Sequence, residues 1–517
     1  MNKRITRNFI FLLASLGFNA QGFAQNAGDL DQTFGVNGST ITDLGIGYDQ
    51  CSGLVIQPDQ KIVIAGRGYI DNGWYPTLIR MNTDGTLDDT FDSDGIAKGD
   101  VPHSTSFYAE ADALALQPDG KFLYAFHLDF FGQDGLAVTR FNSDGSIDND
   151  FGSNGTATQL VMTESNYSNS LLLQADGKIL ITGNGQAYDN APNSMLAVRF
   201  DADGQIDQSF ADNGIFVFNQ GTNSRIYDAK QDGDGKIVMA CSSGYSGYWD
   251  YVIVRLNEDG SFDETFGEAG IASFNISDSY DSPKFLTLRE DGSVIVVGYA
   301  YSDDGSNMNM AMVSLTSGGV IDTAFGNEGI VVTPFGDGDD IAESVTIAPD
   351  GKILIAGHHE DFYIYGAVLR FNANGEPDTS FGTDGIVLID AYSYIIENIK
   401  LQADGKIVVC GWTGFSGTNE HHFTASRLLY EGANSTNDAD MKENQISVFP
   451  NPASDFVSIQ GITSLALITI SDITGKTVMN EYVIQNAILD ISNLDMGIYM
   501  MTVLENGGST TKKVIVQ

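Results

Sequence analysis

The chain has 517 residues, enough for about three domains or for one large repeat array with an appendage. Hydrophobic residues make up 42%, so a large core can form, whereas the net charge of −42 disfavours nucleic acid and anionic membranes as partners. The 3 cysteines include no CxxC pair, which excludes a disulfide-rich scaffold and the thioredoxin and zinc-ribbon patterns.

The N-terminus predicts a secretory signal peptide over residues 1–24. Three basic residues among the first seven precede an apolar stretch of about ten residues, which is too short to span a bilayer. We expect export through the Sec translocase and cleavage after Ala24; the alternative is an N-terminal hydrophobic helix. No later stretch approaches ~18 apolar residues, so we expect no membrane span.

Residues 25–432 contain a motif that occurs seven times, Asp-Gly-Lys-Ile or a close variant between two apolar runs. The copies lie 54 to 60 residues apart and begin at Asp59, Asp119, Asp176, Asp234, Asp291, Asp350 and Asp404. Asp-Gly between apolar runs is a strong signal for a β-hairpin. The sequence therefore predicts one hairpin in each repeat.

Two further elements follow each hairpin. One resembles Arg-Phe-Asn-x-Asp-Gly and begins at Arg80, Arg140, Arg199, Arg255 and Arg370, with weaker copies at Ser314 and Arg427. The other is Asp-x-x-Phe, ending at Phe34, Phe91, Phe151, Phe210, Phe266, Phe325 and Phe381. Four short apolar strands per repeat, with no helical periodicity, predict an all-β fold, a seven-bladed β-propeller over 25–432. An open β-solenoid is the alternative.

The order of these elements predicts how the ring closes. The first Asp-x-x-Phe copy precedes the first hairpin, and none follows the seventh. We therefore expect residues 30–38 to dock against the strand at 424–429, with Phe34 packed between blades seven and one. Cys51 and Cys410 are expected at similar height on these two blades, either as a disulfide or as buried free thiols.

The repeats resemble the delta-60 repeat, a family of bacterial β-propeller repeats. The resemblance covers residues 28–432 and rests on Phe-Gly-x-x-Gly, Asp-Gly-Lys-Ile and Arg-Phe-Asn-x-Asp-Gly. The chain departs from the pattern at Phe126 and Cys241, which replace glycine, and at Ser314, which replaces arginine. The resemblance implies a propeller fold and attaches no activity to it.

The C-terminal region changes character. Residues 433–444 are small, polar and charged and predict a linker, and the alternating short strands of 445–517 predict a small β-sandwich. This segment resembles the C-terminal sorting domain of type IX secretion cargo of Bacteroidota. The resemblance implies handling by the type IX secretion machinery and a secreted or outer-membrane surface location in a Gram-negative bacterium. Its candidate sorting-signal residues are Pro450, Asn451, Pro452, Gly475, Lys476, Gly497, Tyr499, Lys512 and Lys513.

Residues that occur in every repeat are interpreted as scaffold. The repeated arginines are expected to pair with aspartates such as Asp88 and Asp148. An arginine at the first-ligand position argues against calcium in the Asn-x-Asp-Gly turns, and the acidic loop Asp337–Asp340 is a looser calcium candidate. HExxH and GxSxG motifs are absent, so we expect no enzyme activity and no cofactor.

Histidines and aromatic residues give the candidate sites. His358, His359, His421 and His422 are expected in equivalent loops of neighbouring blades, where they form a weak metal candidate against exposed loops with chance histidines. The loops that follow the hairpin strands should share one face and are rich in aromatic residues. The candidate ligand-binding residues there are Trp74, Tyr75, Tyr248, Trp249, Tyr301, Tyr363 and Trp412. The alternative is that these side chains only shield strand ends.

The function predicted from these features is a secreted or cell-surface, monomeric, non-catalytic propeller that serves as a binding or adhesion module. Its ligand would be a glycan or a protein. The alternative is a hydrolase that acts on an extracellular polysaccharide or on a calcium-dependent substrate. A pair of carboxylates facing each other in the central channel would favour the hydrolase.

Overall fold

The computed structural model shows an all-β chain that divides into two compact units, Asn26–Glu431 and a C-terminal unit that begins at Gly432. The structure describes residues 25–44, 48–70, 73–99, 107–108, 114–130, 133–219, 223–245, 248–277, 279–302, 305–336, 338–389, 393–414, 420–432, 447–449, 453, 456–460, 466–472, 476–483, 487–492, 494, 496–505 and 508–516. The predicted signal peptide and linker lie outside these residues, as do Pro450, Asn451, Pro452 and Gly475.

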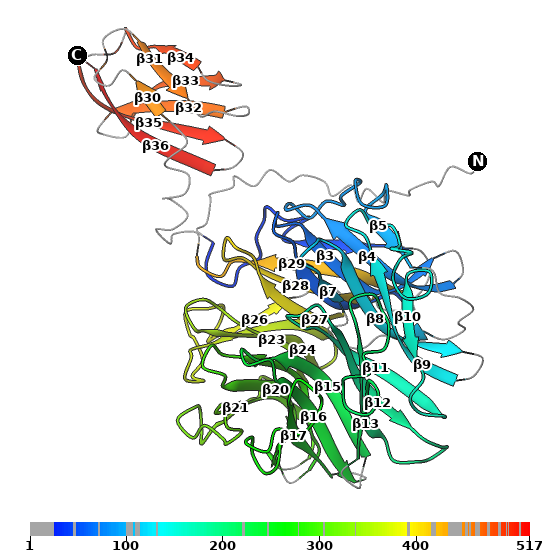
Figure 1. The fold of residues 1–517 in the computed structure, drawn as a ribbon. Helices are drawn as coiled ribbons and strands as arrows, with labels where there is room; N and C mark the ends of the chain where they lie inside the picture. The colour runs from blue at the N-terminus through cyan, green and yellow to red at the C-terminus, as the bar shows by residue number, and fades with distance from the viewer. Residues whose placement is uncertain are drawn as a thin grey trace. The chain divides into compact units, whose positions relative to one another are not determined.

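The described strands β1 to β29 of the first unit form seven sheets (Figure 1). Sheet 1 contains β2 (Gln50–Ile56), β3 (Ile62–Ile70), β4 (Gly73–Met81) and β5 (Ile96–Lys98). Sheet 2 contains β6 (Phe107–Tyr108), β7 (Leu114–Leu116), β8 (Phe122–Phe130), β9 (Gln133–Phe141) and β10 (Thr156–Gln159). Sheet 3 contains β11 (Ser165–Leu173), β12 (Ile179–Gln186), β13 (Ser194–Phe200) and β14 (Ile215–Phe218).

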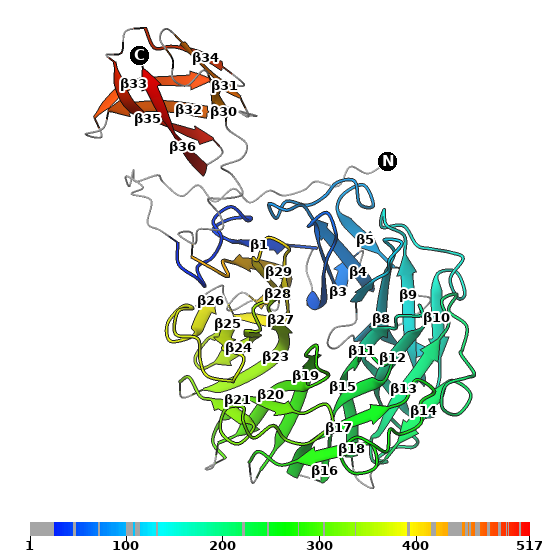
Figure 2. The ribbon, with the colours of Figure 1, turned by 60° about the vertical axis from the view of Figure 1, so that its left-hand side comes forward.

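The next three sheets repeat this order. Sheet 4 contains β15 (Asn223–Gln231), β16 (Ile237–Tyr245), β17 (Tyr248–Leu256) and β18 (Ile271–Phe274). Sheet 5 contains β19 (Asp281–Leu288), β20 (Val294–Tyr301), β21 (Met308–Leu315) and β22 (Ile330–Thr333). Sheet 6 contains β23 (Asp339–Ile347), β24 (Ile353–Glu360), β25 (Ile364–Phe371) and β26 (Ile386–Ile389). Each is an antiparallel meander whose first strand we call the inner strand. Figure 2 shows the inner strands β11, β15, β19 and β23 facing a common centre.

The predicted hairpins join the inner strand to the second strand of each sheet. Their shared geometry explains the Asp-Gly pair, because the glycine adopts a left-handed backbone, with φ of 87° at Gly177 and 85° at Gly351. In the first repeat Gln60 stands at this position and takes the same conformation, with φ of 68°. The aspartate oxygen accepts the backbone N–H two residues on, as in Asp176 to Lys178 at 3.1 Å.

Sheet 7 closes the ring with strands from both ends of the unit. It contains β27 (Tyr394–Leu401), β28 (Ile407–Gly414) and β29 (His421–Leu428), and its outer strand is β1 (Ser39–Thr42). β1 pairs antiparallel with β29, with Ser39 opposite Ser426, and β2 contacts β27 across the junction. Phe34 is fully buried in a cluster with Phe423. The predicted closure through the N-terminus is confirmed.

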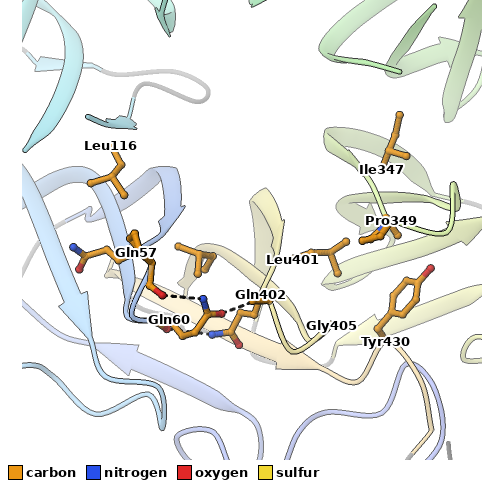
Figure 3. A pocket seen from close by; sticks show the side chains of 13 residues that line it. Gln57, Gln60, Leu116, Ile347, Pro349, Leu401, Gln402, Gly405 and Tyr430 are labelled. Atoms are coloured by element: carbon orange, nitrogen blue, oxygen red, sulfur yellow. Dashed lines mark hydrogen bonds between the residues drawn. The ribbon is translucent and has the colours of Figure 1, made fainter. Parts of the chain in front are cut away.

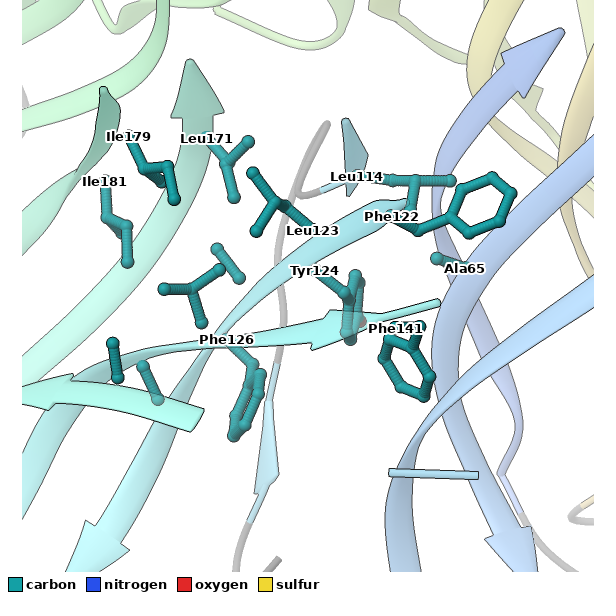
Figure 4. Close-up of a cluster of buried hydrophobic side chains, with 14 of the residues drawn as sticks. Ala65, Leu114, Phe122, Leu123, Tyr124, Phe126, Phe141, Leu171, Ile179 and Ile181 are labelled. Carbon is teal, nitrogen blue, oxygen red and sulfur yellow. The ribbon is translucent and has the colours of Figure 1, made fainter. Parts of the chain in front are cut away.

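The hydrophobic core lies between neighbouring sheets. Figure 4 shows one such cluster around β8, where every residue from Phe122 to Phe126 has a fully buried side chain. Because β8 is covered on both faces, its apolar residues form a continuous run instead of alternating with polar ones. Phe126, which replaces the glycine of the repeat pattern, is buried within this cluster. The all-β propeller fold predicted from the repeats is therefore confirmed.

The C-terminal unit consists of two sheets in its described residues. One contains β30 (Ser447–Phe449), β31 (Phe456–Gln460) and β34 (Ala487–Asp490). The other has the order β33 (Thr477–Val483), β32 (Ala466–Asp472), β35 (Gly497–Glu505) and β36 (Gly508–Val516). Both sheets supply side chains to one hydrophobic cluster, for example Val457 and Ile468. Of the sorting-signal candidates, Tyr499 is buried, whereas Lys513 is exposed on β36.

Candidate functional site

The propeller unit has two ends, which we call the hairpin face and the loop face. Each inner strand ends on the hairpin face, where its Asp-Gly turn lies. The second strand returns to the loop face, as β3 does at Ile70 and β28 at Gly414. Because the strands are antiparallel, the loops that follow the second strands emerge together on the loop face.

The repeated arginines belong to the scaffold. Arg80 donates from Nε to Asp88 at 2.6 Å, and its guanidinium lies 4.5 Å from the centre of the Phe91 ring. It also donates to the carbonyl of Ser143 in the next sheet, at 2.7 Å. The arginine–aspartate pair recurs at 2.7–2.8 Å in Arg140–Asp148, Arg199–Asp207, Arg255–Asp263, Arg370–Asp378 and Arg427–Asp31. The predicted pairing is confirmed, and in each of these six repeats the same arginine also donates to a backbone carbonyl of the next sheet.

The lysine of the hairpin motif binds the same carboxylate, a role that the sequence did not reveal. Lys61 contacts Asp88 at 2.7 Å, and Lys178 contacts Asp207 at 3.5 Å. Burial alone would raise the pKa of Asp207, but hydrogen bonds from Ser209 and the charges of Arg199 and Lys178 lower it to about 2. The aspartate is therefore held ionised between two cations.

Sheet 5 lacks both the repeated arginine and the hairpin lysine, and a single arginine at another position takes their place. Ser293 stands where the lysine would be, and Ser314 stands in place of the arginine. Arg289, at the start of the hairpin turn, donates to the Ser314 hydroxyl at 3.1 Å and to the Ala373 carbonyl of the next sheet at 2.9 Å. Its guanidinium also lies 5.5 Å from the centre of the Phe325 ring. One arginine from a different position thus restores the link between sheets.

The structure does not bring the two histidine pairs together in equivalent loops, so that prediction is wrong. His358 and His359 end the second strand of sheet 6, whereas His421 and His422 begin the third strand of sheet 7. His359 Nδ1 lies 2.7 Å from Asp340 Oδ1. In the described ranges, no group of three or more histidine, cysteine, aspartate or glutamate residues has a metal-binding arrangement.

The acidic turns use their carboxylates internally. Asp84 accepts from the backbone and the hydroxyl of Thr86, at 3.0 and 2.6 Å, so it closes its own turn. In the acidic loop, Asp339 accepts from the Met308 backbone at 2.8 Å and Asp340 accepts from the Phe335 backbone at 3.0 Å. Asp337 and Gly338 belong to the same predicted loop, and Asp337 lies outside the described residues.

Several predicted ligand-binding aromatics pack against neighbours of the loop face. Trp74 meets Tyr69 edge to face at 5.0 Å, and Tyr75 lies under the Lys98 ammonium at 3.7 Å. Trp412 stacks on His421 with ring centres 4.2 Å apart. These three candidates are half-buried and held in place, which leaves only part of each ring accessible.

Two predicted candidates are largely exposed. Tyr248 has 67% of its surface accessible and Tyr363 has 62%. Both lie on the loop face, at or just before the start of a third strand, β17 and β25 respectively. Exposed tyrosines of this kind can contact a ligand without rearrangement of the scaffold.

The remaining candidates, Trp249 and Tyr301, belong to an aromatic cluster between sheets 4 and 5. Its centre is Tyr280, which lies 5.7 Å from Trp249, 6.0 Å from Tyr299 in a stacked arrangement, and 6.3 Å from Tyr301. We call Trp249, Tyr280, Tyr299 and Tyr301 the tyrosine cluster. The sequence did not single out Tyr280, because it lies in the connection that enters β19 instead of in a loop after a second strand.

A cation borders the tyrosine cluster. The Arg225 guanidinium lies 5.5 Å from the centre of the Trp249 ring, and its buried Nε has no hydrogen-bond partner among the residues that the structure describes. Burial raises the pKa of Tyr299 well above its usual range, so the phenol stays protonated and can donate. The cluster therefore presents aromatic surface together with hydrogen-bond donors.

A pocket of about 540 Å³ opens on the hairpin face (Figure 3). Leu116, Ile347 and Leu401 from three inner strands supply apolar lining. Gln402 donates to the Gln60 carbonyl at 3.2 Å across the junction of sheets 7 and 1. Gln402 and Gln60 are thus engaged with each other within the ring, and the pocket is mainly apolar.

Carboxylates of the inner strands are engaged with partners. Glu343 forms an ion pair with Lys284 at 3.3 Å, and Glu397 accepts from Trp412 Nε1 at 3.1 Å. Within the described residues, these contacts hold each of the two carboxylates in a separate interaction. Glu343 and Glu397 therefore do not form the pair of facing carboxylates that would favour a hydrolase.

Comparisons with known families agree with both units. The family described as "Domain of unknown function (DUF5122) beta-propeller" matches residues 57–91, 117–151, 174–210, 233–266, 348–381 and 402–421. The matched ranges omit the fifth repeat, in which Ser293, Ser314 and Arg289 depart from the shared pattern. The "Secretion system C-terminal sorting domain" matches residues 447–517. No curated protein matches the chain.

Similar solved structures include PorZ, a surface component of the type IX secretion system of Porphyromonas gingivalis, at 13% identity and a TM-score of 0.33, covering 92% of this chain and 75% of that one. Polysaccharide lyase Uly1 is 13% identical with a TM-score of 0.44, covering 75% and 91%. The β-propeller domain of the Trilobed protease from Pyrococcus furiosus is 12% identical with a TM-score of 0.37, covering 75% and 98%. Such TM-scores do not inform the function of this chain.

The secretion signal and the repeats together fix the class of protein. The sorting domain indicates a secreted or cell-surface protein of Bacteroidota that the type IX secretion machinery handles. The described residues contain no helix that could cross a membrane. The chain is therefore a secreted or cell-surface β-propeller protein built from DUF5122 repeats, with a type IX secretion sorting domain at its C-terminal end.

Proposed function

We propose that the propeller is a non-catalytic binding module that holds a neutral extracellular glycan on its loop face. The observation that carries this proposal is the tyrosine cluster with Arg225 beside it. Aromatic rings stack on the apolar faces of sugars, and the phenols and the guanidinium can donate to sugar hydroxyls. Such a surface at the end of a rigid ring is suited to binding.

The net charge of the chain disfavours acidic glycans as ligands and leaves neutral ones. A net charge of −42 repels polyanions at long range, so an acidic polysaccharide would approach against the field of the whole protein. Stacking on aromatic rings requires no charge on the ligand. A neutral polysaccharide therefore fits both the local chemistry and the overall charge.

The absence of catalysis is part of the proposal. The repeated arginines, lysines and aspartates are used to join sheets, and Glu343 and Glu397 are held in separate contacts. We expect the aromatic rings and donors of the loop face to hold a glycan without cleaving it.

The test is a binding screen of the full chain on an array of neutral glycans, followed by titration calorimetry with the best ligand. Tyr280→Ala and Tyr301→Ala should each weaken binding by about 5- to 10-fold, the loss of one stacked ring. Tyr188→Ala is the matched control, because Tyr188 is 66% exposed on the loop face of sheet 3, away from the cluster. The proposal fails if no neutral glycan binds, or if the cluster variants bind like the wild type.

A further inference from the structure

Two cysteines face each other where the ring closes. Cys51 lies on β2 of sheet 1 and Cys410 on β28 of sheet 7, 359 residues apart in the sequence. Their Sγ atoms are 3.0 Å apart, and the two side chains are 2% and 0% exposed. A disulfide needs a sulfur separation of about 2.05 Å, so about 1 Å of movement shared by two side chains would complete the bond.

Positions equivalent to those of Cys51 and Cys410 can be identified at other junctions between neighbouring sheets. Cys51 precedes the bulge of its inner strand, and Cys410 is opposite the residue that follows the bulge in the inner strand of sheet 7. The equivalent pairs at other junctions are Thr182 with Ile226, Ala240 with Pro283, Val297 with Ala342, and Ala356 with Ile396. Among these described junctions, two cysteines occur only where the two ends of the unit meet, at the sheet that is completed by pairing of the N-terminal β1 with β29.

The surroundings suit an uncharged disulfide. Cys51 and Cys410 belong to a cluster with Leu54, Phe423 and Ala425, and both sulfurs lie 3.7 Å from the Gly53 carbonyl oxygen. A disulfide carries no charge and no donor, so it can remain in this apolar site without a partner. The other contacts that close the ring, such as the four-residue pairing of β1 with β29 and the Asp31–Arg427 ion pair, are non-covalent.

We propose that Cys51 and Cys410 form a disulfide that covalently closes the propeller ring during export. The chain is secreted, and disulfides form in the oxidising compartment outside the cytoplasm. The two thiols lose two protons and two electrons, and the electrons reduce the disulfide of a thiol–disulfide oxidoreductase to two thiols. One cysteine first forms a mixed disulfide with that protein, and the thiolate of the other then displaces it. Since both sulfurs are buried after closure, the exchange takes place before the sheets meet.

The test traps free thiols in the full chain recovered from the culture medium, by alkylation in denaturant with and without prior reduction. The expected result is one alkylated cysteine, Cys241, before reduction and three after it, with a peptide that links Cys51 to Cys410. Cys241→Ala is the control and should give none before reduction and two after. Three alkylated cysteines before reduction would overturn the proposal.

Thermal melting tests whether the bond closes the ring. A crosslink over this loop should raise the Tm of the oxidised protein by about 5 °C over the reduced one. Cys51→Ala should melt at the same temperature with and without reductant, and Cys241→Ala should keep the full difference. A linked peptide without a difference in Tm would show that the bond forms but does not hold the ring closed.

Discussion

Phe34 offers the sharpest test of how the ring is held, because it belongs to the N-terminal segment that completes sheet 7. Its side chain is fully buried, and the Arg427 guanidinium lies 4.7 Å from its ring centre. Arg427 also binds Asp31 at 2.8 Å and donates to the Thr83 carbonyl of sheet 1. One phenylalanine thus packs where the two ends of the unit and the first sheet meet.

The cost of Phe34→Ala follows from this position. Truncation of a fully buried phenylalanine costs about 3–5 kcal/mol, which includes the cavity left behind. The stacked guanidinium contributes a further ~0.5–2 kcal/mol at a desolvated site. Phe151 has the same burial and the same stacked arginine, Arg140 at 4.4 Å, but belongs to a repeat whose outer strand, β10, follows its partner β9 directly in the chain. Phe151→Ala should therefore lower the free energy of unfolding by a similar amount.

The two variants should differ in whether the N-terminal segment becomes accessible to a protease. Unfolding in guanidinium chloride measures the decrease in the free energy of unfolding. Limited proteolysis of the native protein measures the release of residues 25–44. We expect Phe34→Ala to make this segment cleavable, because Phe34 is its fully buried anchor and the remaining contacts are the strand pairing and polar contacts with β29, and Phe151→Ala to leave it protected. A loss below about 1 kcal/mol for Phe34→Ala, or equal cleavage in both variants, would refute this reasoning.

Three further predictions concern the scaffold and export. Arg289→Ala should lower the free energy of unfolding by about 1.5–3 kcal/mol, since charged hydrogen bonds between sheets 5 and 6 are lost; an unchanged denaturation midpoint would contradict this. The pKa of Asp207 is lowered in the folded state to about 2, so its contribution to stability is present above the unfolded value of about 3.9 and is lost as pH falls toward 2. The Tm should fall over this window, and Asp207→Asn should reduce the slope; a flat Tm between pH 5 and pH 2 would disprove it. Deletion of residues 445–517 should leave the melting of the propeller unchanged and retain the protein in the periplasm, and normal yield in the medium would argue against this.

Much of the propeller could be predicted from the sequence because its signals are local and repeated. An Asp-Gly pair specifies a turn with a left-handed residue, and the same pair recurs at nearly constant spacing. An Asp-x-x-Phe element precedes the first hairpin and none follows the seventh, and this order alone predicts that Phe34 packs against sheet 7. The sorting domain was predicted in the same way, from short motifs in a fixed order.

The candidate site was predicted only in part. The loop face and most of its aromatic residues follow from their places after the second strands. Tyr280 and Arg225 do not, since one lies in a connection and the other on an inner strand. Packing of sheet 5 on sheet 4 brings Tyr280 to Trp249, and pairing within sheet 4 brings Arg225 there. The histidine pairs show the opposite error, because similar residues in neighbouring repeats were placed in equivalent loops although they lie on different strands.

The sequence alone thus determined the elements whose causes lie within a few residues: the turns, the strands, the repeat and the secretion signal. Tertiary structure decided everything that depends on contacts across junctions. The hairpin lysines reach the aspartates of another element, Arg289 replaces two cations missing from sheet 5, and two cysteines 359 residues apart come within 3.0 Å. The reason is physical. Neighbouring residues determine the local backbone conformation, whereas packing between sheets depends on which side chains the closed ring brings into contact.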